Sequence, residues 1–262
     1  MGGGCVGDVA RVTLENGTDV VAKLGGPASG LGREGFMLSY LADHTELPVP
    51  QVLHASDALL LMECLPASGR LDDAAERHAA DLVAALHGVT AAQFGFDGAT
   101  VIGGLVQPNP WSDRWVDFFR DHRLLDMGRR AMDAGKLPAA VMARLETLSG
   151  RLERWLEEPP RPSLIHGDMW GGNVLCEAGR ISGFIDPAIY YADAEIELAF
   201  TTLFNTFGET FFARYHERRP IAAGFFEERR DLYNLYPLLV HVRLFGGHYV
   251  SSVSRTLERF GC

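Results

Sequence analysis

The first part of the chain, up to about residue 65, is a succession of short apolar runs of strand length. Two of these runs, Val9–Leu14 and Val20–Leu24, flank the dipeptide Asn16-Gly17. This dipeptide favours a tight β-hairpin, because both of its residues tolerate a positive φ. We therefore expect the chain to begin with two paired antiparallel strands.

A helix and two more strands are predicted to follow the hairpin. Residues 33–42 repeat apolar side chains at helical spacing; these are Phe36, Met37, Tyr40 and Leu41. Two prolines then precede a short strand at Val52–His54, and Ala58–Leu65 is apolar enough to be a buried strand. Together these elements predict a small sheet with one helix packed on it.

From residue 72 onward the pattern is mainly helical. Asp72 and Asp73 begin a helical run that continues to His87, and acidic residues in a first turn are favoured by the helix dipole. Aromatic side chains then recur at three- and four-residue steps. They predict a packing stripe along one helix face, formed by Trp111, Trp115, Phe118, Phe119 and His122.

Glycine and proline divide the remainder into segments. Gly135 and Pro138 separate the aromatic helix from another helix, which is expected to continue to about Leu156. A proline-rich segment then ends that helix, because proline cannot continue it. Residues 163–186 alternate loop and strand, and long helical patterns run from about Ala194 to the last residue.

This layout predicts an α+β fold of two lobes joined by a hinge near residues 62–66. The first lobe, residues 1–65, is small and rich in β-structure. The second, residues 66–262, is larger and mainly helical. With 262 residues, 47% of them apolar, the chain is long enough to give both lobes a core.

The charge and the cysteines exclude several classes of protein. A net charge of −10 makes DNA and RNA poor partners, because a polyanion would be repelled over most of the surface. The four cysteines form no C-x-x-C pair, which is typical of a reduced protein without disulfides. No signal-peptide pattern is seen, nor an apolar run of the ~18 residues that cross a bilayer. We expect a soluble, cytoplasmic protein that binds neither nucleic acid nor membrane.

The strongest chemical signal is the sequence HGDMWGGN at residues 166–173, followed by IDP at residues 185–187. Phosphoryl transfer requires an acceptor hydroxyl held in line, a group that accepts its proton, and Mg²⁺ that neutralises the phosphates. Mg²⁺ prefers carboxylate and amide oxygens. The motifs supply such groups: Asp168 would accept the proton, and Asn173 and Asp186 would hold the metal.

His166 is expected to be a scaffold histidine that bonds to the loop backbone, and not the base. The alternative interpretation is that Asp168 and Asn173 are ordinary turn-forming residues and that Asp186 caps a local element. Both motifs together, in this order and after a helical stretch, favour the chemical interpretation.

Signals for nucleotide binding lie nearer the N-terminus. Gly2, Gly4 and Gly7 match a phosphate-binding loop, in which a bare backbone can approach phosphates closely. Lys23, on the second hairpin strand, would contact the α- and β-phosphates of ATP, and Glu34 on the next helix would pair with it. The alternatives are a flexible glycine tail, an edge-strand lysine and a surface carboxylate.

The hinge is the expected place for the adenine. Glu63, Cys64 and Leu65 end the last strand of the small lobe, where backbone N–H and C=O groups could pair with the base. The chain begins inside the glycine segment, without the strand that usually precedes such a loop. This predicts ATP binding that is weaker than usual for the fold.

Taken together, these residues resemble the fructosamine (ketosamine) 3-kinases, which are relatives of the aminoglycoside and choline phosphotransferases. The resemblance covers nearly the whole chain. Besides the two motifs above, several stretches are similar to this family in particular: Gly2–Cys5, Pro108–Trp111, Trp115, Phe118-Phe119, Trp170, Asp186–Tyr191, Leu232–Tyr236, His241 and Phe245-Gly246.

The resemblance implies the two-lobed protein-kinase-like fold and ATP-dependent phosphorylation of the 3-hydroxyl of ketosamines, free or protein-linked. The 3-phosphate would make the glycation adduct unstable and so free the amine. It implies Asp168 as the base, Asn173 and Asp186 as Mg²⁺ ligands, and Lys23 with residues 63–65 as the ATP site. The alternatives are a kinase of another small alcohol, such as an aminoglycoside or an amino-alcohol, and a nucleotide-binding pseudokinase.

One segment departs from the family's pattern. Residues 192–198 read ADAEIEL, where the family more often has Gly-x-Arg-Glu-x-Asp-Leu, so the usual arginine is replaced and one acid is longer. We expect Glu197 to keep the role of holding the catalytic loop. The acids at 193, 195 and 197 would attract a cationic amine or, equally, form a solvated helix start.

Two further residues are candidates for function. Cys5 lies inside the glycine segment, where backbone N–H groups would lower its thiol pKa. A disulfide between two Cys5 thiols would then give a homodimer; an inert small side chain is the alternative. Trp170, two residues after Asp168, would stack on a sugar face, whereas the aromatic stripe and Tyr190-Tyr191 are expected to belong to the core.

Overall fold

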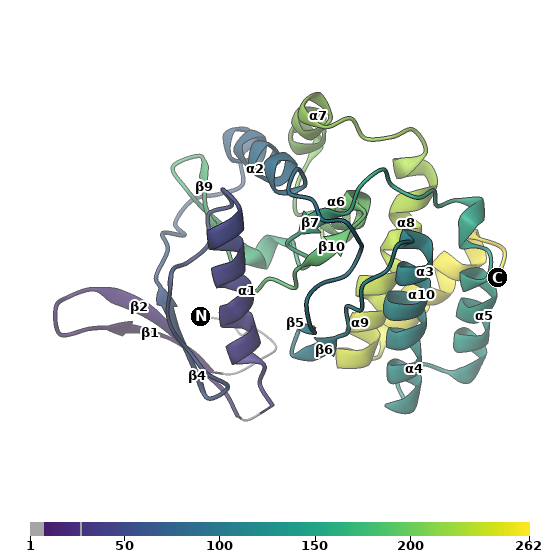
Figure 1. Cartoon of the computed structure of the whole chain (residues 1–262), viewed down its shortest axis with the longest axis horizontal. Coiled ribbons are helices and arrows are strands. Elements are labelled where there is room, and N and C mark those ends of the chain that lie inside the picture. Colours follow the sequence, from purple (N-terminus) through teal and green to yellow (C-terminus); the bar gives the residue numbers. More distant parts are fainter. Residues whose placement is uncertain (1–7, 27) are drawn as a thin grey trace.

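The first lobe is an antiparallel sheet with one helix packed on it, as seen in a computed structural model that describes residues 8–26 and 28–262 (Figure 1). The strand order is β1-β2-β4-β3. Apolar side chains of the helix and of β4 form the small core between them. The predicted hairpin, helix and two strands are all present: β1 (Asp8–Thr13), β2 (Asp19–Leu24), α1 (Leu31–His44), β3 (Val52–Ala55) and β4 (Leu59–Glu63).

The turn of the β1–β2 hairpin differs from the tight two-residue turn that we expected. Leu14 N–H donates to Thr18 O at 2.8 Å, and Gly17 N–H donates to Leu14 O at 2.9 Å. Gly17 has a φ of +82°, and Asn16 is not among the residues with positive φ. Three residues form the tip, so only the last of them needs the left-handed conformation.

The second lobe is mainly helical, as predicted, and its helices surround one large apolar core. Helix α2 begins after Asp72, whose carboxylate accepts from the N–H groups of Ala74 and Ala75. Helix α5 ends earlier than predicted, at a glycine, Gly150. The helices are α2 (Asp73–Leu86), α3 (Trp115–Phe119), a π-helical turn (Arg120–Leu125), α4 (Asp126–Asp133), α5 (Ala139–Ser149), α6 (Ala194–Leu203), α7 (Glu209–Arg218), α8 (Arg230–Tyr233), α9 (Leu235–Phe245) and α10 (His248–Arg259).

Three two-stranded ribbons lie within this helical lobe. The β8–β9 ribbon falls in the segment predicted to alternate loop and strand, whereas the β5–β6 ribbon and strand β10 were not predicted. Their runs of three residues are too short to show a periodicity, and pairing defines them. The ribbons join β5 (Thr100–Ile102) to β6 (Leu105–Gln107), β7 (Ser163–Ile165) to β10 (Tyr190–Ala192), and β8 (Val174–Glu177) to β9 (Arg180–Phe184).

The predicted aromatic stripe is wrong for one of its five members. The three aromatic residues of α3 are fully buried, and His122 follows them in the π-helical turn. Trp111 lies before the helix and is 45% exposed. The chain beside it is extended, because Ser112 pairs with Phe94 in an isolated β-bridge.

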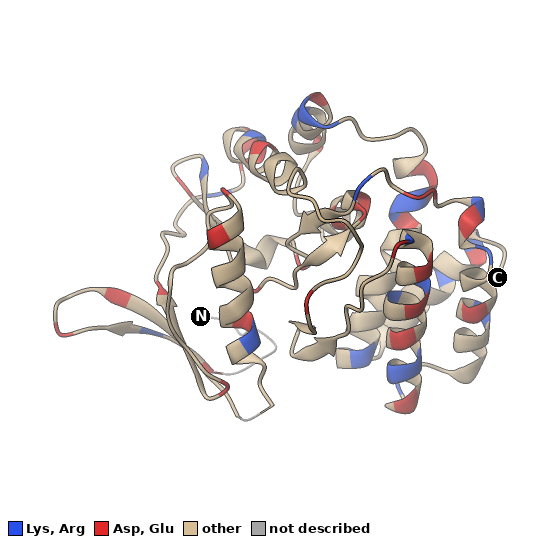
Figure 2. Cartoon of the chain, viewed as in Figure 1, with Lys and Arg blue, Asp and Glu red and all other residues tan. Residues whose placement is uncertain are grey.

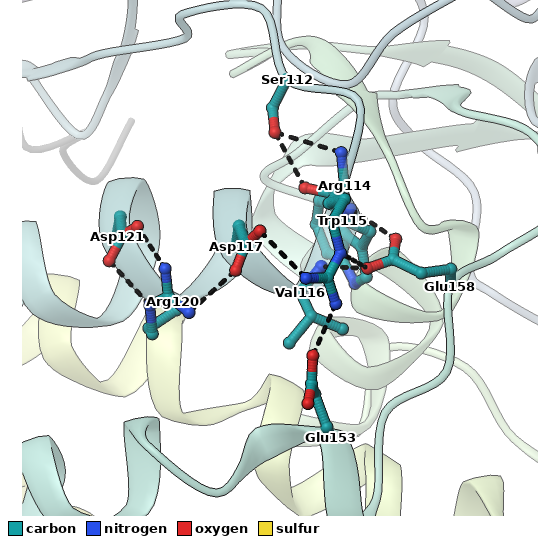
Figure 3. A network of polar contacts seen from close by, with 9 residues as sticks. All are labelled: Ser112, Arg114, Trp115, Val116, Asp117, Arg120, Asp121, Glu153 and Glu158. Carbon is teal, nitrogen blue, oxygen red and sulfur yellow. Dashed lines mark hydrogen bonds and ion pairs between the residues drawn. The ribbon is translucent and has the colours of Figure 1, made fainter.

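A glutamate from the proline-rich segment fixes the start of α3 (Figure 3). The carboxylate of Glu158 accepts from Trp115 N–H at 2.6 Å and from Val116 N–H at 3.3 Å. Arg114 lies between this carboxylate and Glu153, with an Nη2–Oε1 distance of 2.5 Å to Glu153. The helix start is thereby tied to a segment that is distant in the sequence.

The connection between the lobes runs along the β8–β9 ribbon. Gly69 N–H donates to Cys176 O at 2.8 Å. Leu65 lies over Gly183, where a Cβ atom would come within 2.2 Å of the leucine Cδ1. The chain thus changes lobe close to the predicted hinge, and the division after residue 65 stays a prediction.

Charged residues of both signs are interspersed along the helices of the larger lobe (Figure 2). Within residues 8–26 and 28–262, no helix has the length and apolar character needed to cross a membrane.

Candidate active site

The loop that bears the candidate base is packed against the segment that follows Asp186. Gly167 has a φ of +84°, and a Cβ atom on it would lie 2.2 Å from Ala188 O. Ala188 N–H in turn donates to His166 O at 2.7 Å. Only glycine fits both the conformation and the space, so the turn before Asp168 depends on this residue.

Glu197 of α6 holds the same turn from inside the lobe. Its two carboxylate oxygens accept from His166 N–H at 3.1 Å and from Gly167 N–H at 2.7 Å. His87 Nε2 lies 3.0 Å from Oε1 of Glu197. Burial alone would raise the pKa of Glu197, but the hydrogen bond and charge of His87 outweigh it and keep the pKa below its usual value. This is the geometry expected of a residue that holds the loop.

His166 is fully buried, and burial lowers the pKa of its imidazole. Its Nδ1 atom lies 3.4 Å from Asp168 N, at the long limit of a hydrogen bond. A neutral, enclosed imidazole that faces the loop backbone has the position expected of a scaffold histidine.

Asp168 and Asn173 are bonded to one another on this loop. Asn173 Nδ2 donates to Asp168 O at 2.8 Å and to Asp168 Oδ2 at 3.1 Å. Burial, and then the carboxylate of Asp186, raise the pKa of Asp168 to about 7, against the hydrogen bond from Asn173. A carboxyl group whose pKa lies near neutrality is well matched to accepting a proton from a hydroxyl.

Asp186 reaches the same place from the end of β9. Ile185 N–H donates to Asn173 O at 3.0 Å, which joins the two segments through their backbones. Asp186 has a φ of +55°, a left-handed conformation that is uncommon for a residue with a side chain and that the surrounding structure must maintain. The backbone is therefore held at the position where a metal ligand was predicted.

Lys23 links this carboxylate to the first lobe. Its Nζ atom contacts Asp186 Oδ1 and lies 2.6 Å from Glu34 Oε1, the pairing expected from the sequence. The lysine is only 5% exposed. Burial works to lower its pKa, but Glu34 and Asp186 outweigh burial and raise it, so the side chain keeps its charge between the two carboxylates.

The donor set at this point fits Mg²⁺. Nδ2 of Asn173 is directed at Asp168, so the side-chain donor of Asn173 is used within the loop and its amide oxygen is the group that could bind a cation. One amide and one carboxylate oxygen suit a hard cation that takes its other ligands from phosphates and water. Within the described residues there is no cluster of three or more His, Cys, Asp or Glu side chains that would hold a metal by itself.

The family model described as fructosamine kinase matches residues 1–260. The chain belongs to the fructosamine kinase family. The protein is accordingly an enzyme, an ATP-dependent phosphotransferase.

Several relatives align with this chain over most of its length. The ketosamine-3-kinase of Mus musculus is 32% identical over 265 residues, which are 94% of this chain and 80% of the relative. The chloroplastic protein-ribulosamine 3-kinase of Arabidopsis thaliana is 30% identical over 270 residues, 99% of this chain and 81% of the relative.

Solved structures confirm the predicted two-lobed protein-kinase-like α+β fold. A protein from Thermobifida fusca assigned as a fructosamine-3-kinase superposes with a TM-score of 0.85 at 34% identity, covering 96% of this chain and 89% of that one. The aminoglycoside phosphotransferase APH(4)-Ia shares the fold with a TM-score of 0.64 at 19% identity, covering 98% and 96% of the two chains.

The nucleotide side of the kinase is described in part. Glu63 N–H is used within the sheet, where it donates to Gln51 O at 2.9 Å. Cys64 and Leu65 follow Glu63 in the chain, and their backbone groups lie at the predicted hinge. Four residues of the glycine segment named above lie outside the described residues: Gly2, Gly4, Cys5 and Gly7.

Trp170 lies beside the candidate base and is 42% exposed. Its indole covers Gly172, where a Cβ atom would come within 2.3 Å of the ring. Phe204, at the end of α6, meets the indole edge-on at 6.3 Å between ring centroids. An exposed aromatic face therefore stands next to the loop, as a sugar-stacking residue requires.

The acids at the start of α6 are engaged within the fold. Asp193 Oδ1 accepts from Glu195 N–H at 3.0 Å, and Asp193 Oδ2 accepts from the hydroxyl of Tyr233 at 2.6 Å. Arg229 donates to both oxygens of Glu195, at 2.6 and 2.8 Å. The expectation of a solvated helix start is wrong, because these carboxylates bond to partners from α8 and the segment before it.

Sequence reasoning missed two residues that support the site. His87, at the end of α2, bonds to Glu197, and Gln107 of β6 donates to Ala188 O at 3.1 Å. Their partners lie 110 and 81 residues away along the chain. No local pattern signals such contacts.

Proposed function

We propose that this enzyme transfers the γ-phosphoryl group of ATP to the 3-hydroxyl of a ketosamine, and that the phosphorylated adduct then releases its amine. The names of the Arabidopsis and mouse relatives, protein-ribulosamine 3-kinase and ketosamine-3-kinase, support this acceptor. Release of the amine makes the overall reaction a deglycation.

One observation carries the proposal. Asn173 bonds through its side chain to Asp168 and through its backbone to the residue before Asp186. The three polar groups that phosphoryl transfer requires are thereby held in one place. In the proposed reaction Asp168 orients the acceptor hydroxyl and accepts its proton.

Asn173 and Asp186 would hold Mg²⁺, which when bound neutralises charge on the phosphates. Lys23, fixed by Glu34, would contact the α- and β-phosphates. Support for the use of ATP comes from an aminoglycoside phosphotransferase of the same fold, solved as a complex with AMP-PNP and hygromycin B. Residues 63–65 would then border the adenine, and Gly4 and Gly7 the phosphates.

We further propose that Trp170 stacks on the sugar and that the reaction takes place in the cytoplasm. The second proposal rests on Cys64, Cys176 and Cys262, which are free thiols. Dimerisation through Cys5 remains a separate proposal, tested by non-reducing gels with and without peroxide.

The decisive experiment measures transfer of ³²P from γ-labelled ATP to a ribulosamine and to a fructosamine, with the corresponding unglycated amine as control. Product analysis by ³¹P NMR locates the phosphate. Labelling of a ketosamine at the 3-oxygen, with none of the amine, is the expected result. Transfer to an aminoglycoside or an amino-alcohol, with ketosamines unlabelled, would replace the proposed acceptor.

A further inference from the structure

A buried polar network lies directly behind the catalytic loop, and the proposed reaction does not use it. Gln107 is 1% exposed, and all its polar atoms are bonded. Its Nε2 donates to Ala188 O at 3.1 Å and to Thr100 Oγ1 at 2.8 Å, and its Oε1 accepts from the Tyr236 hydroxyl at 2.6 Å. A buried amide with every group satisfied has one defined orientation.

Gln107 is joined to a second buried amide through the hydroxyl of Thr100. Its oxygen accepts from Gln107 Nε2 and also, at 2.9 Å, from Asn109 Nδ2. Asn109 Oδ1 in turn accepts from Arg123. A flipped Gln107 amide would set its oxygen against Ala188 O, and because a carbonyl oxygen can only accept, this contact fixes the orientation of the amide.

Arg123 anchors the far end of the network. It is completely buried, and no carboxylate of a described residue lies within 4 Å of it. Its guanidinium carbon lies 3.9 Å from the ring centroid of Tyr190 and 4.6 Å from that of Phe118. A buried cation without a counter-ion is costly. Here the ring faces and the Asn109 oxygen stabilise the guanidinium. The network is thereby joined to the segment that ends at Tyr190.

The network meets the active site at Ala188 O. That carbonyl lies against Gly167, and Ala188 N–H bonds to His166. Two residues earlier stands Asp186, in a left-handed conformation that must be maintained by its surroundings. Gln107 is the side chain from the β5–β6 ribbon that donates to this turn.

We propose that Gln107 is a positioning residue of the kinase: its amide, oriented by Tyr236 and Thr100, holds Ala188 O and thereby fixes Asp186 against the catalytic loop. The inference rests on the proposed function, because it gives Asp186 the role of a Mg²⁺ ligand. It explains the buried Asn109 of the Pro108–Trp111 stretch as part of the same support. Gln107 itself contacts no reactant.

The test compares Gln107→Met, which keeps the size of the side chain and removes its polar atoms, with Tyr236→Phe, which removes only the orienting hydroxyl. Val253→Ala, in the core beneath α10, is the control for general destabilisation. Affinity for ADP is measured by calorimetry with and without Mg²⁺, and kcat and KM are measured with a ketosamine. Calorimetry does not depend on the acceptor, so it tests the inference even if no ketosamine is phosphorylated.

For Gln107→Met we expect the Mg²⁺-dependent gain in ADP affinity to fall about 3–10-fold, about the worth of one buried hydrogen bond. The ADP affinity without metal and the KM for the ketosamine should stay within twofold of the values for the unsubstituted enzyme. The kcat should fall by about the same factor as the Mg²⁺-dependent gain in ADP affinity. Tyr236→Phe should also lower the Mg²⁺-dependent gain in ADP affinity and kcat, but by a smaller factor. If Gln107→Met does not fold, Tyr236→Phe alone tests the inference. The inference is overturned if the metal-dependent gain is unchanged, or if Val253→Ala reduces it equally.

Discussion

The hydroxyl of Tyr40 in α1 lies 2.9 Å from the hydroxyl of Tyr191 in β10, so that the helix bearing Glu34 is hydrogen-bonded to the second lobe. Phe96 lies between the two elements, with its ring centroid 4.9 Å from that of Tyr40 and 6.2 Å from that of Tyr191. The position of α1 is thus fixed by the second lobe as well as by its own sheet.

This relationship predicts a non-additive loss of stability. Tyr40→Phe and Tyr191→Phe should each lower the free energy of unfolding by about 0.5–1.5 kcal/mol, the net worth of one hydrogen bond. The double variant should lose little more than either single variant, because both substitutions remove the same bond. Urea unfolding measures all three; Tyr249→Phe is the control. Fully additive losses would show that the two hydroxyls act separately.

Removal of the proposed base should slow turnover strongly and spare nucleotide binding. Asp168→Ala should lower kcat by about 10²–10⁴-fold, the usual contribution of a general base. The affinity for ADP should change little, since Lys23 and Glu34 are untouched. Steady-state kinetics and calorimetry check the two parts, and Asp168→Asn controls for the lost volume. Undiminished turnover would remove Asp168 from the mechanism.

Two adjacent glycines give a matched test of Trp170. A Cβ atom at Gly172 would come within 2.3 Å of the indole, whereas one at Gly171 would meet nothing within 4 Å. Gly172→Ala should therefore displace the ring and raise the ketosamine KM about 2–12-fold, the equivalent of a lost aromatic contact of ~0.5–1.5 kcal/mol. Gly171→Ala should leave it unchanged. Equal effects of the two substitutions would argue against stacking on Trp170.

The pH dependence of stability should contain a contribution from Asp193. Burial, and then Glu195, raise the pKa of Asp193 from 3.8 to about 6 in the folded chain. The folded state therefore binds the proton more tightly than the unfolded state, and stability contributed by this group is present below pH 4 and lost as the pH rises to about 6.

Asp193→Asn should remove that part of the slope. The shift of about two pKa units corresponds to at most about 3 kcal/mol between pH 4 and 6. Unfolding by urea across this range measures the slope for the variant and for Asp97→Asn, at an exposed loop position. An unchanged slope in Asp193→Asn would place the titration elsewhere.

The local pattern of apolar and polar residues predicted much of the fold. The hairpin, α1 and the helical second lobe have apolar repeats long enough to reveal their period, and the HGDMWGGN and IDP motifs name their own polar groups. Lys23 and Glu34 were paired from motif and element order alone, and their ammonium and carboxylate groups are in contact.

What the sequence did not reveal depends on contacts between distant segments. Gln107 and Ala188 lie 81 residues apart, and Tyr40 and Tyr191 lie 151 residues apart. The three-residue strands β5 and β10 are defined by such pairings and carry no period of their own. The acids at the start of α6 were expected to be solvated for the same reason. The partners of Asp193 and Glu195, which are Tyr233 and Arg229, come from another helical segment.

The contact between Gly167 and Ala188 has a consequence for how this enzyme can vary. Position 167 admits nothing larger than hydrogen, both because of its φ of +84° and because a carbonyl occupies the space. Saturation mutagenesis should therefore recover only glycine among the active variants at position 167, whereas the nearby position 171 should accept many residues. How well a position of this loop tolerates substitution is therefore set by the free space around it and not by its distance from the reacting atoms.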